Sequence, residues 1–471
     1  MKRSCFIIFL LILSLKVLSQ SSTYNDILKD FINRPELKNA GISIYSESLK
    51  SGNITIEHNP DMSLIPASVF KIIPTAIALE TFGSDHKFKT ELAYSGKISS
   101  DGVLDGNIYI IGYGDPCLGS SNFSHYGANG GVLKQWINEI NKLGIKKING
   151  NITVDISYFG DINIPNTWIW EDIGNYYGHQ GSALNYMDNS YSIHFSTGLT
   201  DGSETYITKV VPDDLDISFK NYVTSSSTTG DEAYIYLGSD NTERIIRGTL
   251  PWKKSNYVIK GSLPDPGLYL AKTFTDFLSN NGIQVSNPPR VISTYEDVSK
   301  EVIHVTYSPT LKEIVAQTNI KSNNLYAEVL SFHITKSTGK SYKESVIDYF
   351  RSKIIDTGGL NIEDACGLSH FNTATSRQIT YLLKYMKNDK DFFNSLPIAG
   401  INGTLSGHNL NLKNKLYAKS GSMTRIRAYA GYLYTSSGDE IVFCIIVNNF
   451  NCKGSQMRKI YDDLFISISK T

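Results

Sequence analysis

The sequence predicts an α/β (α+β) fold in which both ends of the chain build one domain with an antiparallel sheet, and a large, mainly β insertion interrupts it. Strand-like and helix-like segments alternate in both terminal regions, whereas residues from about 92 to 305 contain short apolar runs separated by Gly, Asn and Asp. The composition, with 41% apolar and 19% charged residues among 471, is that of a protein with a full core. The length favours two or three domains.

The first 20 residues have the composition of a secretory signal. Lys2 and Arg3 precede an apolar run over residues 5–15, and the small Ser19 marks a possible cleavage site. The run is shorter than the roughly 20 residues that a spanning helix needs. We therefore predict a signal peptide over residues 1–20 and an exported protein with no stable membrane span after cleavage. An uncleaved anchor is the alternative.

Charge and cysteine content exclude several classes of protein. Lys+Arg and Asp+Glu both number 45, so no overall basic field favours nucleic acid or an anionic membrane. Outside the signal the chain has Cys117, Cys366, Cys444 and Cys452, which are too few for a disulfide scaffold. Without a CxxC or HExxH motif, we expect no metal site.

The N-terminal region reads as helix, hairpin and helix. Apolar residues recur at helical spacing over residues 27–32, and residues 40–45 alternate as a strand. A Ser-Gly turn leads to a second strand at 54–56. A helix should follow over residues 66–79, and Pro74 within it should kink or shorten it.

The C-terminal region predicts three strands, at 416–419, 428–434 and 441–447, and a final helix that begins near Ser455. Strands from the two ends should pair with one another. We predict a discontinuous domain of residues 21–91 and 306–471 and an inserted region of residues 92–305, with two mainly β domains. The pattern does not assign the helix-like stretch 268–278 to either.

Ser68-Val69-Phe70-Lys71 is the first candidate for chemistry. On a helix, residues three apart share a face, so a lysine kept neutral by its surroundings can take the proton of the serine hydroxyl. The same spacing occurs at Ser84 and Lys87 and at Ser467 and Lys470. Only Ser68 stands at the start of an apolar helix, so we select Ser68 and Lys71.

A Ser-x-Asn element is the second candidate, because its hydroxyl can relay a proton and its amide can hold a substrate backbone. The tripeptide 239–241 falls in a predicted hairpin turn, and 279–281 falls at a helix end. The tripeptide 322–324 stands between two apolar helical segments, so we select Ser322 and Asn324.

Lys419-Ser420-Gly421 is the third candidate. On a strand, a cation and a hydroxyl can bind a carboxylate, and a glycine lets a substrate backbone approach closely. Lys50-Ser51-Gly52 has the same letters but lies in a predicted hairpin turn.

The three motifs occur in an order that resembles that of the serine penicillin-recognising enzymes. Their spacing narrows the choice among the families of these enzymes. Ser68 and Ser322 are 254 residues apart, and Ser322 and Lys419 are 97 apart. The chain is similar to the class C low-molecular-mass penicillin-binding proteins, which are D-alanyl-D-alanine carboxypeptidases and endopeptidases. Further segments resemble that family's GGGDP, DGSGLS, LPVAG and DGTL stretches, in order: residues 112–116, 364–369, 396–400 and 403–405.

The resemblance implies a transpeptidase-like domain and a mechanism that requires no metal or organic cofactor. Ser68 would attack the penultimate D-Ala carbonyl of a peptidoglycan stem peptide with Lys71 as general base, and the backbone amides of Ser68 and Ser422 would form the oxyanion hole. By the same resemblance, Ser322 would pass a proton to the leaving amine, and Asn324 would hold the peptide backbone. The terminal carboxylate would be bound by Lys419, Ser420 and Gly421. The stem peptide would be contacted by Asp155 and His370. β-Lactam antibiotics would acylate Ser68, and the enzyme would work in the periplasm or cell envelope of a bacterium.

Four departures from the family pattern bear on the details. Cys366 replaces a serine, His370 an arginine, Ser420 the commoner threonine and Asn323 an aspartate. We interpret Cys366 as a small packed residue, whereas for His370 substrate contact and a plain surface position are equally open. A β-lactamase and a non-catalytic wall-binding protein remain alternative functions. The balance of the two peptidase activities, the role of the insertion and the oligomeric state stay open.

Overall fold

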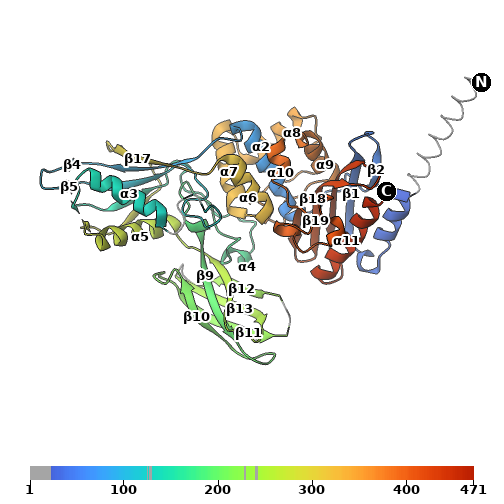
Figure 1. Cartoon of the computed structure of the whole chain (residues 1–471), viewed down its shortest axis with the longest axis horizontal. Helices are drawn as coiled ribbons and strands as arrows, with labels where there is room; N and C mark the ends of the chain where they lie inside the picture. The colour runs from blue at the N-terminus through green and yellow to red at the C-terminus, as the bar shows by residue number, and fades with distance from the viewer. Residues whose placement is uncertain (1–22, 125, 127–129, 228–229, 239–241) are drawn as a thin grey trace, which may run out of the picture. The chain divides into compact units, whose positions relative to one another are not determined.

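The computed structural model describes residues 23–471 apart from 125, 127–129, 228–229 and 239–241 (Figure 1). These residues pack into two compact units: the first contains 23–81, 315–322 and 340–471, and the second contains 82–314 and 323–339. The predicted signal, 1–20, and the Ser239–Asn241 tripeptide lie outside the described residues. Across the described part, every helix is too short or too polar to cross a bilayer. The predicted domain boundaries stay predictions.

A five-stranded sheet forms the centre of the first unit, and its order is β18-β19-β20-β1-β2. All of its neighbouring strands are antiparallel. The N-terminal strand β1 pairs with the C-terminal strand β20 from Gly41 opposite Asn448 to Ser48 opposite Ile441. The predicted antiparallel sheet is therefore confirmed. Its strands are β1 (Gly41–Ser48), β2 (Ile54–His58), β18 (Leu416–Met423), β19 (Ile426–Tyr434) and β20 (Glu440–Asn448).

Alternation along β1 assigns its two faces to different helices. Ile42 and Ile44 belong to a core that the C-terminal helix α11 (Gly454–Ser469) and the helical residues 23–32 complete. Ser43 and Tyr45 point the other way, toward α9 (Ser376–Met386). Figure 1 shows the sheet between these layers.

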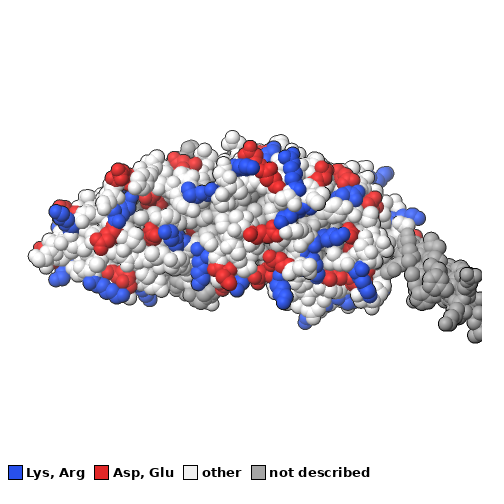
Figure 2. All heavy atoms as spheres, turned by 90° about the horizontal axis from the view of Figure 1, so that it is seen from above, with Lys and Arg blue, Asp and Glu red and all other residues white. Residues whose placement is uncertain are grey.

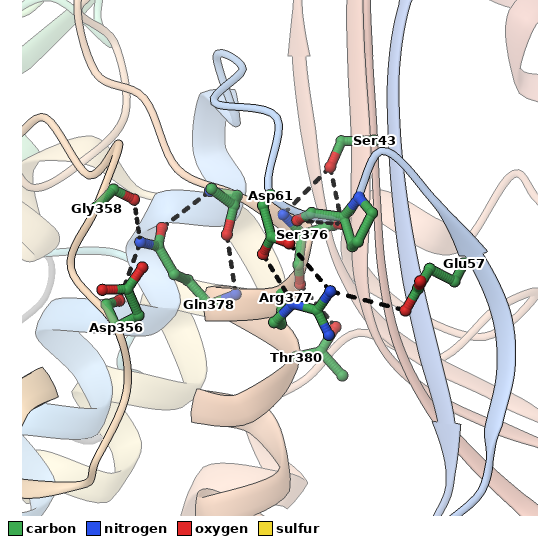
Figure 3. Close-up of polar contacts among 11 residues, drawn as sticks. Ser43, Glu57, Asp61, Asp356, Gly358, Ser376, Arg377, Gln378 and Thr380 are labelled. Atoms are coloured by element: carbon green, nitrogen blue, oxygen red, sulfur yellow. Dashed lines mark hydrogen bonds and ion pairs between the residues drawn. The ribbon is translucent and has the colours of Figure 1, made fainter.

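The start of α9 is tied to the sheet by side-chain hydrogen bonds (Figure 3). The Ser43 hydroxyl donates to Ser376 Oγ at 2.8 Å, and Arg377 Nε donates to Asp61 Oδ1 at 2.8 Å. Thr375 and Gln378 form a capping box that satisfies free N–H groups of the first turn. These contacts hold α9 in one position over the sheet.

The predicted helix over 66–79 is split. A 3₁₀ turn, η2 (Ala67–Lys71), comes first, and α2 (Ile72–Phe82) follows it. Pro74 has no N–H to donate to the Phe70 carbonyl, so the α-helical ladder does not extend back through the turn. The other helices that contribute to the first unit are η1 (Pro35–Leu37), α6 (Leu311–Lys321), α8 (Tyr342–Ser352), α10 (Lys390–Asn394), η5 (Gly403–Leu405) and η6 (Leu410–Leu412).

The described residues of the second unit form four sheets, as a mainly β insertion predicts. One has the order β16-β8-β6-β3-β17: β3 (Lys89–Tyr94), β6 (Ile108–Gly112), β8 (Ile152–Asp155), β16 (Arg290–Ile292) and β17 (Glu301–Tyr307). A second is β15-β7-β5-β4: β4 (Lys97–Ile98), β5 (Val103–Asp105), β7 (Lys147–Ile148) and β15 (Gln284–Val285).

Two three-stranded sheets complete the second unit. They are β10-β9-β14 and β11-β13-β12: β9 (Ser190–Thr197), β10 (Thr205–Val211), β11 (Ser218–Ser226), β12 (Glu232–Leu237), β13 (Glu243–Pro251) and β14 (Tyr257–Ser262). Its helices are α3 (Gly131–Lys142), α4 (Trp170–Ile173), η4 (Met187–Asn189), α5 (Pro266–Asn280) and α7 (Asn324–Thr338). The stretch 268–278 is thus part of α5 in this unit.

Basic and acidic side chains are interspersed on the surface that Figure 2 shows. A nucleic-acid footprint needs basic residues gathered on one face or stripe. The described residues visible there form no such stripe.

Candidate active site

The turn η2 presents Ser68 at the start of α2. Ala67 has φ +47°, a left-handed conformation that is costly for a residue with a side chain. Val69 and Phe70 are fully buried, whereas Ser68 is only half-buried. A Cβ at Gly367 would lie 2.1 Å from the Ala67 carbonyl oxygen, so the backbone of residue 367 presses directly on the turn. This packing holds the strained turn and leaves the Ser68 hydroxyl accessible.

Lys71 lies next to the Ser68 hydroxyl. Its Nζ donates to Ser68 Oγ at 2.9 Å and to the Cys366 carbonyl oxygen at 2.6 Å. In a 3₁₀ turn, side chains three residues apart lie directly above one another, so the spacing of Ser68 and Lys71 brings them together. The side chain of Lys71 is fully buried. A buried amine beside a half-buried hydroxyl is the arrangement that general-base activation of a serine requires.

Ser322 and Lys419 form a second serine–lysine pair. Lys419 Nζ donates to Ser322 Oγ at 2.9 Å and to the Ser420 carbonyl oxygen at 2.8 Å. Ser322 follows α6 with φ +58°, a second left-handed residue with a side chain at this site. Burial, and next the nearby charge of Lys71, hold the pKa of Lys419 well below its usual range. The two lysines are therefore electrostatically coupled.

The strand β18 borders the Ser68 turn. A Cβ at Gly421 would lie 2.3 Å from the Pro66 carbonyl oxygen and 3.1 Å from the Ser68 nitrogen, so this position accepts only glycine without movement. Ser422 next to it is exposed. The backbone of residues 421 and 422 therefore runs beside the Ser68 amide.

Two residues near these lysines, Thr404 and Asp364, were given no role by the sequence analysis. The Ser420 hydroxyl donates to Thr404 Oγ1 at 2.7 Å. Asp364 accepts from the Gly367 and Ser369 amides, at 2.7 and 2.6 Å, and so shapes the loop whose Cys366 carbonyl receives Lys71. Both Thr404 and Asp364 lie in segments that resemble the family, which is the signal that could have singled them out.

Three further residues predicted for the site are not part of the two serine–lysine pairs: Asn324, Asp155 and His370. Asn324 begins α7 in the second unit, and its Nδ2 donates to the Tyr177 carbonyl at 2.7 Å. Asp155 ends β8 in the same unit, where it is buried, accepts from the Ser157 amide at 2.9 Å and lies 3.9 Å from Lys300 Nζ. His370 belongs to the first unit and its Nδ1 is buried without a hydrogen-bond partner in the described part of the chain. The roles expected for these three residues stay predictions.

Asn323, in contrast, has a local structural task. Its side chain accepts from the Tyr326 amide at 3.2 Å and caps the N-terminus of α7. An asparagine serves such a cap as well as an aspartate does. Replacement of the family's aspartate at this position therefore preserves the helix start that follows Ser322.

The remaining copies of the motifs lie in turns and at helix ends. Lys50, Ser51 and Gly52 are exposed in the turn between β1 and β2. Ser279 and Asn281 end α5, and Ser467 and Lys470 end α11. None of these has the buried lysine that accompanies Ser68 and Ser322.

The comparisons with known proteins establish the family. The model of the D-Ala-D-Ala carboxypeptidase 3 (S13) family matches residues 24–466, so the chain belongs to this family of peptidases. The class that the resemblance implied is confirmed, and the protein is a serine-type D-Ala-D-Ala carboxypeptidase.

Particular relatives span most of the chain. It is 23% identical over 430 residues to the D-alanyl-D-alanine carboxypeptidase DacB of Haemophilus influenzae, which covers 88% of this chain and 87% of that protein. It is 26% identical over 440 residues to the D-alanyl-D-alanine carboxypeptidase of an Actinomadura species, at 88% and 79% coverage. The crystal structure of penicillin binding protein 4 (dacB) from Haemophilus influenzae superposes with a TM-score of 0.80 at 21% identity, over 95% of this chain and 99% of that one. This structural similarity confirms the predicted α/β fold.

Proposed function

We propose that this enzyme is exported and removes the terminal D-Ala of peptidoglycan stem peptides through an acyl-enzyme on Ser68, and that it cleaves D-Ala cross-links by the same steps. The observation that carries the proposal is the 2.9 Å hydrogen bond from the buried Lys71 Nζ to Ser68 Oγ. A cross-link differs only in a larger leaving amine, so one site can serve both reactions.

Acylation begins when Lys71, in its neutral form, takes up the proton of the Ser68 hydroxyl. Two buried ammonium groups near one another hold two protons less readily than isolated ones, and the charge of Lys71 is one cause of the lowered pKa of Lys419. Ser68 Oγ then forms a bond to the penultimate D-Ala carbonyl carbon, and the backbone amides of Ser68 and Ser422 stabilise the oxyanion. The closeness of β18 to the Ser68 amide supports this pairing of donors.

Breakdown of the tetrahedral intermediate needs a proton on the leaving nitrogen. Ser322 donates it and regains one from Lys419, whose Nζ lies 2.9 Å from Ser322 Oγ. The C–N bond breaks, D-Ala leaves as the amine, and water later hydrolyses the ester to regenerate Ser68. No step requires a metal or an organic cofactor.

Substrate recognition uses the charge of Lys419. Because burial disfavours its ammonium form, a substrate carboxylate beside it would offset that cost. Ser420 is the hydroxyl partner of the carboxylate, Gly421 lets the peptide approach, and Asn324 holds the peptide backbone. Of the two residues proposed to contact the stem side chain, His370 has an unpartnered nitrogen, whereas Asp155 is already engaged by Ser157 and Lys300.

β-Lactam antibiotics should acylate Ser68 in place of the substrate. The solved relative from Haemophilus influenzae, at a TM-score of 0.74 and 20% identity over 95% of this chain and 99% of that one, is complexed with a β-lactam, which supports the proposal. The strained β-lactam carbonyl takes the place of the D-Ala carbonyl, and the ring-opened product stays covalently attached because its leaving group cannot diffuse away.

The test is incubation of the enzyme with a labelled penicillin, followed by mass mapping of the adduct. We expect a stable adduct on Ser68 and none in Ser68→Ala. The matched control is Ser84→Ala, which removes the serine of the second SxxK spacing and should label like the wild type. An adduct on another residue would contradict the proposal, and fast release of hydrolysed penicillin without an adduct would indicate a β-lactamase.

Export is proposed from residues 1–20. Expression of the full chain in a bacterium with an outer membrane should place the enzyme in the periplasm, in a form that has lost the signal near Ser19. Mass measurement of the purified N-terminus checks this. A full-length chain recovered with the membranes would indicate an uncleaved anchor.

A further inference from the structure

The turn η5, which contains Thr404, is attached to the edge strand β18. The Ala399 amide donates to the Leu416 carbonyl oxygen at 3.0 Å, and the Ala418 amide donates to the Pro397 carbonyl oxygen at 3.0 Å. Both bonds belong to a short antiparallel bridge between this segment and the strand. The chain that enters η5 is therefore fixed directly beside β18.

The same turn packs against the end of α6. A Cβ at Gly403 would lie 2.3 Å from the Ile320 carbonyl oxygen, so the two backbones are in direct contact. Ile320 comes shortly before Ser322 in the chain, and Leu405, the last residue of the turn, is fully buried. Thr404 is thus held between the strand and the helix that position the second serine–lysine pair.

Thr404 contacts Ser420, the residue to which the proposed function assigns the substrate carboxylate. The Ser420 hydroxyl donates to Thr404 Oγ1 at 2.7 Å. Ser420 is buried, whereas Thr404 is exposed. Within the part of the chain that the structure describes, this is the one hydrogen bond that either hydroxyl makes. The distance is that of an ordinary O–H···O bond, so the orientation of the Ser420 hydroxyl depends on Thr404.

The two hydroxyls have to share their hydrogens with the substrate. A carboxylate only accepts hydrogen bonds, so Ser420 has to donate in order to bind it. In the structure the Ser420 hydrogen is directed to Thr404. Ser420 can donate to a substrate when this bond reverses and the Thr404 hydroxyl donates to Ser420 Oγ. A hydroxyl hydrogen rotates about its C–O bond, so the reversal needs no movement of the heavy atoms.

Thr404 also limits the conformations that Ser420 can adopt. A serine has no branch at Cβ, so its hydroxyl can occupy several staggered positions, whereas a β-branched side chain is stiffer at χ1. The hydrogen bond with Thr404 favours one of these positions. A hydroxyl that accepts a hydrogen bond is also a better donor, so a chain from Thr404 through Ser420 to a carboxylate is cooperative.

We propose that Thr404 is a positioning residue for substrate binding, whose hydroxyl holds that of Ser420 in the orientation that donates to the C-terminal carboxylate of the peptide. The inference rests on the proposed function, which assigns this carboxylate to Lys419 and Ser420. Thr404 acts through Ser420 and takes no part in the proton transfers at Ser68 and Ser322. Loss of its hydroxyl should therefore impair substrates whose leaving group has a carboxylate and spare substrates that lack one.

Two substrates with the same acyl group test the inference: an N-acyl-D-Ala-D-Ala peptide and the p-nitrophenyl ester of the same N-acyl-D-Ala. The ester acylates the same serine, but its leaving group has no carboxylate. Thr404→Val keeps the shape of the side chain and removes the hydroxyl. We expect kcat/KM to fall about three- to fivefold for the peptide, mainly through KM, and less than about twofold for the ester. An equal loss on both substrates would show a merely structural role and overturn the proposal.

A double variant tests whether Thr404 acts through Ser420. Ser420→Ala combined with Thr404→Val should have the same kcat/KM for the peptide as Ser420→Ala alone, because the group that Thr404 orients is already absent. Losses that multiply in the double variant would contradict the proposal. Thr404→Ser keeps the hydroxyl and should restore most of the wild-type value. If Thr404→Ser is no better than Thr404→Val, the hydroxyl is not what matters.

The matched control is Ser406→Ala. Ser406 is exposed, directly follows the same turn, and makes no side-chain hydrogen bond with any described residue. Ser406→Ala should hydrolyse the peptide and the ester like the wild type. A loss as large as that of Thr404→Val, with the same preference for the ester, would show that the effect belongs to the loop and would refute the role of Thr404.

Penicillin labelling of wild-type Ser68 separates this inference from the proposed function. If Ser68 is not labelled, the proposed function fails, and the inference fails with it. If Ser68 is labelled and the wild type hydrolyses the peptide, but Thr404→Val does so equally well, only the role of Thr404 fails.

Discussion

The tripeptide Lys-Ser-Gly occurs once in the edge strand β18 of the central sheet and once in the turn before the opposite edge strand, β2, and the two copies have opposite surroundings. Lys419-Ser420-Gly421 lies within β18 and is buried, whereas Lys50-Ser51-Gly52 is exposed in the turn that leads into β2. A Cβ at Gly421 would collide with the Pro66 carbonyl oxygen at 2.3 Å. A Cβ at Gly52 would meet only Glu47 Oε1, at 4.0 Å.

What differs between the copies is the packing around each edge of the sheet. β18 packs against the turn that carries Ser68, so its lysine is desolvated and reaches Ser322. β2 is short, and four of its five residues are exposed or only partly buried, which is typical of a solvated edge strand. Identical residues therefore gain chemistry only where the fold removes water and supplies partners.

We expect the largest difference in acylation rate between the two copies when the lysine of each copy is replaced. Lys419→Met removes the buried cation that faces Ser322 and should lower the rate of penicillin acylation about 10²- to 10³-fold, as loss of a preorganised electrostatic group does. Lys50→Met should leave the rate unchanged. Stopped-flow or gel-based acylation rates check this, and a Lys419→Met rate above about a tenth of wild type would remove the distinction between the copies.

The glycines should differ nearly as much. Gly421→Ala forces β18 and the Ser68 turn apart, and a misplacement of about 1 Å costs on the order of 100-fold in rate. Gly52→Ala, at φ +73°, should cost about 1–2 kcal/mol in the free energy of unfolding without changing acylation of the folded enzyme. Acylation rates and urea unfolding of both variants give the comparison. If Gly421→Ala acylates normally, the two edges are equivalent at this position.

Stability should respond to pH through Lys419. Its folded-state pKa lies below the unfolded value of about 10.4, mainly because it is buried. Between these values the unfolded chain binds more protons, so this group makes the protein more stable as the pH rises. Lys419→Met removes that dependence and should stabilise the fold by about 1–4 kcal/mol, most at low pH.

Urea unfolding at several pH values between about 6 and 9 measures this difference. The free energy of unfolding of Lys419→Met minus that of the wild type should shrink as the pH increases. Lys50→Met is the matched control. A difference that grows with pH would show that Lys419 is not held with a lowered pKa.

Removal of the serine hydroxyl from each copy should give the smallest difference in activity. Ser420→Ala removes a hydroxyl that donates to Thr404 at 2.7 Å, and loss of one hydrogen bond of about 1 kcal/mol predicts roughly a fivefold loss of kcat/KM. Ser420→Thr keeps the hydroxyl and should restore most of it. Ser51→Ala should have no effect on kcat/KM for a D-Ala-D-Ala peptide. Failure of Ser420→Thr to exceed Ser420→Ala would argue against a role for the hydroxyl.

Many strands and helices of the first unit could be predicted because their sequence patterns extend over only a few neighbouring residues. The strands at 416–419, 428–434 and 441–447 fall within β18, β19 and β20, since each alternates or is continuously apolar over a few residues. The Ser68 and Lys71 spacing was recognisable for the same reason. Pro74 likewise indicated a shortened helix, whereas the 3₁₀ form of the turn over 67–71 was less apparent, because the turn is held by its packing against residues 367 and 421.

The sequence by itself determined which residue types were available, the periods of the strands and helices, and the order of the three motifs. Only the tertiary structure decided which Lys-Ser-Gly is buried, that the Cys366 carbonyl receives Lys71, and that Thr404 lies beside Ser420. The physical reason is that propensity and periodicity act between near neighbours in the chain. Desolvation and hydrogen bonds between residues 97 or 295 positions apart exist only after the core has packed.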